Sequence, residues 1–105
     1  MSKRAMNYEE SLNTALKDPD EAAAYLSAAV AEMAEAGPEV FLLALLDVAK
    51  ANGISDLAEK ADLSRTSLYK ALSNSGAPLF TTVFKVLTSL NLEMDIHRKV
   101  ASGEK

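Results

Sequence analysis

The sequence predicts an all-α fold of about five helices, with a helical N-terminal extension and one short C-terminal strand. Two observations carry this prediction. Apolar residues recur every three to four positions over most of the 105 residues, which is the spacing of one helix face, and Gly or Pro separates the helical stretches. The apolar period changes to two only near the C-terminus. The length is enough for one core without disulfides, and the absence of cysteine excludes thiol chemistry and cysteine-based metal sites.

The first third of the chain contains two predicted helices. Residues 1–17 predict a short helix after a frayed start and form the N-terminal extension. Asp18 then suits an N-cap, and Pro19 suits the first position of a helix that runs to Gly37. Gly37 can adopt the positive φ that ends a helix, and Pro38 begins the next helix at once.

The stretch Glu39–Asn52 is apolar on two sides and predicts the central, most buried helix. Gly53 ends it. The longest apolar run, Val40–Leu46, is far shorter than the roughly 20 residues of a membrane span, and the N-terminus has no hydrophobic signal region. We therefore expect a cytoplasmic protein.

Residues 54–73 read as two short helices around one tight turn, the pattern of a helix-turn-helix. Asp62 stands at the turn, where a residue with positive φ is normal and Asp is tolerated. The apolar stripe continues across the turn through Leu57, Ala58, Ala61, Leu63, Leu68, Ala71 and Leu72. We expect a single helix-turn-helix domain over residues 18–100 and a tail over residues 101–105.

The second helix of this motif predicts a DNA-reading face. With Leu68 at the centre of the buried side and about 100° per residue, Thr66, Lys70 and Ser73 point away from the core. Ser64 suits the N-cap, and Arg65 can reach a phosphate or a guanine edge. The predicted DNA-binding residues are Ser64, Arg65, Thr66, Ser67, Tyr69 and Lys70. The alternative is a solvated helix face in a structural bundle.

The C-terminal third predicts a loop over residues 74–78 and a helix over Leu79–Leu90, whose apolar pattern includes Val83, Phe84 and Leu87. Leu92–His97 then alternates apolar and polar residues, which indicates a strand. A lone strand has no partner within a helical chain. Pairing with the same strand of a second copy would satisfy its backbone groups and form a homodimer.

The charge is unevenly distributed. Residues 1–40 hold three basic and eight acidic side chains, for −5 against −4 for the whole chain. Leu63–Ser75 holds two cations and no anion, so the predicted DNA face is locally positive. Two cations support only modest affinity from one copy, which also favours a homodimer.

Residue types needed for catalysis are sparse. The one histidine, His97, has no Cys or Ser partner nearby in sequence, and no phosphate-binding glycine loop or calcium-binding spacing occurs. Neighbouring acids such as Asp18 and Asp20 are explained by capping and solvation. We expect neither an enzyme nor a bound cofactor or metal.

The order of the predicted helices and turns closely resembles that of the addiction-module antidote family, HigA-like antitoxins with an Xre/lambda-repressor-like helix-turn-helix. The most specific part of the resemblance is the run LAEKADLSRTSLYKALS. The resemblance covers roughly Tyr8–Met94. The family usually has Gly at the turn, where this chain has Asp62, and Gly-Asn-Pro after the recognition helix, where this chain has Gly76-Ala77-Pro78.

The resemblance implies a lambda-repressor-like fold and the antitoxin of a type II toxin-antitoxin module. Such a protein neutralises a small basic toxin of the RelE/HigB kind and represses its own operon by binding operator DNA. The acidic N-terminal part fits a basic partner, although acidic helix starts are also ordinary. Two alternatives stay open: a stand-alone helix-turn-helix regulator of the phage-repressor type, and an interaction module that has lost DNA binding.

Overall fold

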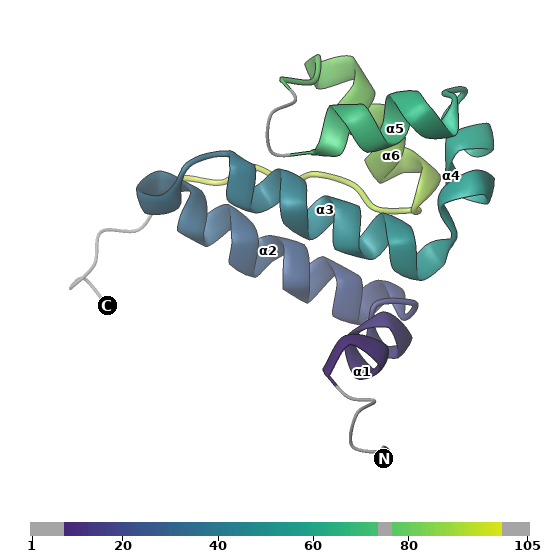
Figure 1. Cartoon of the computed structure of the whole chain (residues 1–105). Coiled ribbons are helices and arrows are strands. Elements are labelled where there is room, and N and C mark those ends of the chain that lie inside the picture. Colours follow the sequence, from purple (N-terminus) through teal and green to yellow (C-terminus); the bar gives the residue numbers. More distant parts are fainter. Residues whose placement is uncertain (1–7, 74–76, 100–105) are drawn as a thin grey trace.

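A computed structural model describes residues 8–73 and 77–99 of the chain. The exposure of the side chains is described from residue 10 onward. The described part is helical (Figure 1), with elements α1 (Tyr8–Ala15), α2 (Pro19–Ala36), α3 (Glu39–Asn52), α4 (Ile54–Lys60), α5 (Arg65–Leu72) and α6 (Phe80–Ser89). This confirms the all-α class. None of these helices is both long and apolar enough to cross a membrane.

The predicted caps set the bounds of α2. The carboxylate of Asp18 accepts a hydrogen bond from the backbone N–H of Asp20 at 2.9 Å, and Pro19 occupies the first helical position. This carboxylate also complements the positive end of the helix dipole. At the other end, Gly37 has φ +96° and donates its N–H to the carbonyl of Met33 at 2.9 Å. The predicted helix from Asp18 to Gly37 is therefore confirmed.

α3 lies at the centre of the fold, as its double apolar face predicts. Leu45, Val48 and Ala49 have no exposed surface. In Figure 1, α1 and α2 lie on one side of α3, and α4, α5 and α6 lie on the other; α3 contacts α1, α2, α4 and α5. Each of these helices carries an apolar stripe, so burial against α3 removes those stripes from water.

Two side-chain hydrogen bonds align α3 with its neighbours. The Tyr25 hydroxyl of α2 donates to Asp47 Oδ2 at 2.6 Å. Asn52 Nδ2, in the last turn of α3, donates to the carbonyl of Leu16 at 3.1 Å and to that of Val48 at 2.9 Å. The Leu16 carbonyl belongs to the link between α1 and α2, where it has no helical partner, so Asn52 satisfies a group that burial would otherwise leave unpaired.

One expectation for the C-terminal third is wrong. The strand predicted over Leu92–His97 is absent, since residues 92–99 have no regular structure and no strand occurs among the described residues. Leu92 packs against the core, whereas Met94 and Ile96 are 47% and 88% exposed. The helix expected over Leu79–Leu90 is present as α6, and Phe84 in its apolar pattern is 52% exposed. The alternation of polar and apolar residues indicates a preference for extended backbone. A strand also needs a neighbouring strand with which its backbone forms hydrogen bonds.

We predict that Leu45→Ala lowers the free energy of unfolding by about 2–5 kcal/mol, because it removes buried methyl groups and leaves a cavity at the centre of the fold. Leu43→Ala on the same helix is the matched control, since Leu43 is 47% exposed and should cost well under half as much. Urea unfolding followed by circular dichroism measures both. Equal losses would contradict the central position of Leu45.

Candidate functional site

The turn between α4 and α5 is built by backbone geometry. Asp62 has φ +61°, and its N–H bonds to the carbonyl of Glu59 at 3.1 Å. The N–H of Leu63 reaches back to the carbonyl of Ala58 at 2.8 Å. This pair of bonds is the Schellman arrangement, which ends a helix and satisfies its last carbonyls. The positive φ expected at Asp62 is confirmed.

Ser64 begins α5. It has extended backbone, and its Oγ accepts a hydrogen bond from the N–H of Ser67 at 3.0 Å. The predicted N-cap is therefore present. Because the cap fixes where the helix starts, it also fixes which residues face the core. Leu68 and Leu72 have no exposed surface.

The predicted DNA-binding residues all lie on the exposed side of α5 or at its start, and we call them the α5 polar face: Ser64, Arg65, Thr66, Ser67, Tyr69 and Lys70. All six are exposed, and Tyr69 has 38% of its surface open to solvent. Ser73, also predicted to point outward, is half-buried instead and donates from Oγ to the carbonyl of Lys70 at 3.0 Å. Ser73 thus caps the helix end.

The charge around this face is mixed. α5 itself contains two cations and no acid. The neighbouring α4 and turn expose Asp56, Glu59 and Asp62 beside a single cation, Lys60. A polyanion close to this face would therefore be attracted to α5 and repelled by α4. Charges of the protein farther than about 8–10 Å from the polyanion are largely screened at ordinary salt. The electrostatics favour contact through the α5 polar face alone.

The loop after α5 is a second region that the sequence singled out. Residues 74–76, which include Gly76, lie outside the described residues. Ala77 is exposed and Pro78 is half-buried. Ala77 offers no side-chain donor or acceptor. Any polar contact there comes from the backbone.

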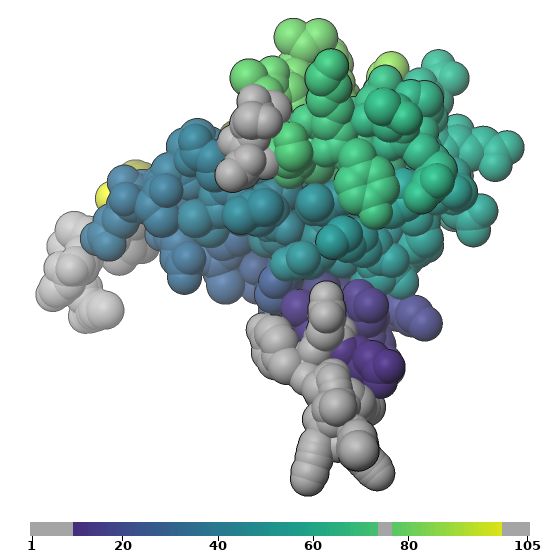
Figure 2. Space-filling model, in the orientation of Figure 1, coloured from purple at the N-terminus to yellow at the C-terminus, as the bar shows by residue number. Residues whose placement is uncertain are grey.

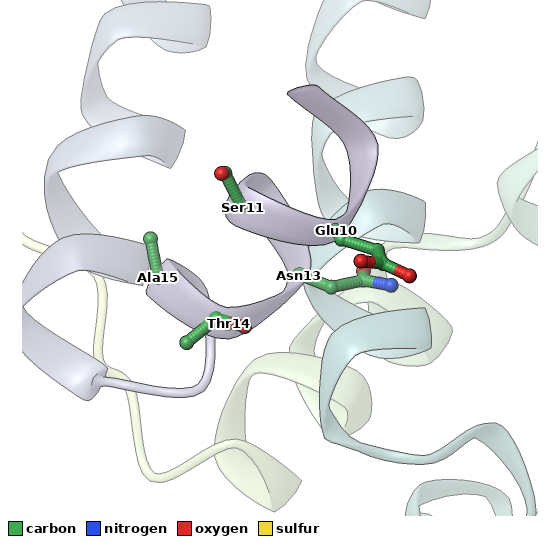
Figure 3. Close-up of a pocket in the computed structure, with 5 residues that line it drawn as sticks. All are labelled: Glu10, Ser11, Asn13, Thr14 and Ala15. Carbon is green, nitrogen blue, oxygen red and sulfur yellow. The ribbon is translucent and has the colours of Figure 1, made fainter. Parts of the chain in front are cut away.

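A shallow hollow on α1 is a weaker candidate. Its described lining is Glu10, Ser11, Asn13, Thr14 and Ala15, all from one helix. Figure 3 shows these side chains on different sides of α1, with Ser11 and Ala15 directed away from Glu10 and Asn13. They do not converge on one point as a binding pocket requires. Among the described residues, no three His, Asp or Glu side chains gather to hold a metal ion either.

The sequence reasoning missed one surface. Leu79, Phe80 and Phe84, at the start of α6, are 72%, 65% and 52% exposed. The rings of Phe80 and Phe84 stack with centroids 6.3 Å apart. Spacing placed Phe84 in the apolar pattern of its helix, but periodicity identifies the apolar side of a helix and not how far the rest of the protein covers it.

Comparison with known proteins gives two matches. Residues 7–98 match the model of a family described as "Probable addiction module antidote protein". A stretch of 60 residues, 57% of this chain, is 47% identical to a protein of Haemophilus influenzae described as an uncharacterized protein. The matched stretch spans 62% of that relative's length. No solved structure matches the chain.

We predict that Ser64→Ala lowers the free energy of unfolding by about 0.5–2 kcal/mol, because the N–H of Ser67 loses its acceptor. Ser64→Asp should retain most of the stability, since a carboxylate also caps a helix and complements its dipole. Ser67→Ala is the control, because only the backbone of Ser67 takes part in the cap. Thermal unfolding of the four proteins measures these effects. A loss for Ser67→Ala equal to that for Ser64→Ala would contradict the cap.

Proposed function

The chain belongs to the family of probable addiction module antidote proteins, and from this premise we propose that it is the antitoxin of a type II toxin-antitoxin module. In this proposal it acts in the cytoplasm, represses its own operon by binding operator DNA, and neutralises a basic toxin of the RelE/HigB kind. It does so by binding alone, without catalysis.

The observation that carries the DNA-binding part is the orientation of α5. Leu68 and Leu72 anchor one side of the helix in the core, and the α5 polar face is open to solvent on the other. A helix held in this way, after a tight turn from a supporting helix, can enter the major groove with its N-terminal residues near the base edges. Arg65 lies in that first turn and suits a guanine edge or a phosphate.

The number of cations supports binding as a homodimer. Each copy contributes Arg65 and Lys70, and counterion release from two contacts gives little affinity. Two copies double the contacts and read two half-sites about one helical turn apart.

Charge supports the toxin-binding part. From residue 10 to residue 40 every described acid is exposed, namely Glu10, Asp18, Asp20, Glu21, Glu32, Glu35 and Glu39. Ribonuclease toxins of this kind hold RNA and are therefore basic. Opposite charge would speed their association with this acidic surface, and coverage of an RNA-binding groove would block activity. The acidic surface and the α5 polar face involve different residues, so the two roles are separable by mutation.

We predict that Arg65→Ala and Lys70→Ala each weaken binding to the DNA upstream of this protein's gene. Loss of a guanine contact should cost about 1–3 kcal/mol and relax specificity, whereas loss of a phosphate contact should weaken binding to all sequences and lower the salt slope by about one. Gel shifts at several salt concentrations separate the two. Lys17→Ala, which removes an exposed cation from the link between α1 and α2, is the charge-matched control. Unchanged affinity in both α5 variants would overturn the DNA-binding assignment.

We predict that Glu32→Lys plus Glu35→Lys weakens rescue from the toxin more than it weakens DNA binding. Both acids are exposed near the end of α2, where a cation suits the helix dipole, so the fold should persist. Deletion of residues 1–17 is a poorer test, because Leu16 is only 2% exposed and belongs to the core. Glu93→Lys plus Asp95→Lys is the control, because it makes the same change of charge elsewhere on the chain.

Arg65→Ala plus Lys70→Ala should have the opposite effect: it should abolish repression of the operon and preserve rescue from the toxin.

Co-expression with the reading frame beside this protein's gene measures rescue. If that gene is harmless alone, or its product never co-purifies with this protein, the antitoxin proposal fails. DNA binding that persists in that case would identify a stand-alone repressor.

A further inference from the structure

The start of α6 carries an apolar patch that no described part of the chain covers. We call Leu79, Phe80 and Phe84 the α6 patch. The second half of the same helix face is covered, since Leu87 is 5% exposed and α6 contacts α4. The light green start of α6 stands at the top edge of the molecule in Figure 2, away from the body formed by α2 and α3. Contiguous exposed aromatic groups of this kind mark interaction sites more often than scattered apolar residues do.

We infer that the α6 patch is the contact between two copies of this chain, related by a two-fold axis. This inference deepens the homodimer part of the proposed function by naming its surface. A two-fold contact joins a patch to itself, so the patch must be complementary to its own copy. The stacked rings of Phe80 and Phe84 meet this condition, because aromatic pairs attract one another in offset or edge-to-face arrangements.

The absence of charged residues around the α6 patch favours this surface as the contact with a second copy. Two identical chains of net charge −4 repel each other, and the repulsion is smallest where the contacting surface is neutral. Residues 71–84 contain no charged side chain, in a chain of which 25% is charged. Lys85 follows on α6 about 100° around the helix from Phe84, at the rim of the patch, where salt screens it. The exposed Ala77 and Thr81 supply small, neutral neighbours.

The position of the patch connects it to DNA binding. Leu79 lies seven residues beyond the end of α5 in sequence, and a two-fold axis at the α6 patch would place the two α5 helices symmetrically about that axis. Two recognition helices placed symmetrically in this way read a palindromic operator. The C-terminal segment is the competing surface, because Met94 and Ile96 are also exposed. It is less suited to pairing of identical copies, since Glu93 and Asp95 alternate with these apolar residues.

Sedimentation of the full-length chain tests the inference. Phe80→Ser plus Phe84→Ser should raise the dimer dissociation constant about thirtyfold or more, the effect of losing one hot-spot residue. Val30→Ser plus Leu43→Ser is the matched control, because these residues are 50% and 47% exposed on α2 and α3. It should leave the constant unchanged. Circular dichroism checks that the Phe variant stays folded.

A mixed pair of variants tests the two-fold contact independently of folding. Phe84→Glu and Phe84→Lys should each be monomeric alone, because like charges meet across the axis, whereas an equimolar mixture should form the heterodimer. Restored association in the mixture cannot arise from unfolding of either variant.

Three outcomes would overturn the inference. The wild-type chain could sediment as a monomer at every concentration, the Phe variant could dimerise as the wild type does, or Met94→Ser plus Ile96→Ser could abolish the dimer while the Phe variant retains it. The last result would assign the contact to the C-terminal segment. A dimer that depends on Phe80 and Phe84 but binds no DNA would support this inference and count against the proposed function, so the two failures are distinguishable.

Discussion

Burial of α3 is the constraint on which the rest of the fold depends. Leu45, Val48 and Ala49 are wholly enclosed, and α1, α2, α4 and α5 each press an apolar stripe against this one helix. None of the shorter helices would be stable alone, since isolated helices below about 12–15 residues are marginal in water. α4 and α5 have seven and eight residues, so their structure is a consequence of packing on α3.

The turn between α4 and α5 determines which side of α5 packs on the core and which side is exposed. Asp62 adopts positive φ, the carbonyls of Ala58 and Glu59 are satisfied by the residues that follow, and Ser64 caps the next helix. The direction of α5 is set within these few residues. A shift of the start of α5 by one residue would turn the helix by about 100° and bury part of the α5 polar face.

Three surfaces of different chemistry result from this arrangement. Residues 10–40 present exposed acids, α5 presents hydroxyl groups and two cations, and the start of α6 presents stacked aromatic rings. We propose a different partner for each surface: a basic protein, a nucleic acid backbone and an identical copy. Because they belong to different helices packed around one core, substitutions on one surface need not disturb the others.

Local physical chemistry determined much of this protein from its sequence alone. Helix bounds at Asp18, Gly37 and Gly53, the positive φ at Asp62 and the cap at Ser64 depend on neighbours within four residues, so sequence patterns predict them. The buried side of α5 also followed from periodicity, because only one side of that helix is apolar.

Only the tertiary structure decided how much of the apolar side of each helix is covered and whether the C-terminal segment forms a strand. Phe84 and Leu87 share one side of α6, yet Leu87 is buried in the core while Phe84 stays open. Leu92–His97 alternates like a strand but finds no partner within the described chain. Coverage and strand pairing are relations between distant segments, so no local pattern specifies them.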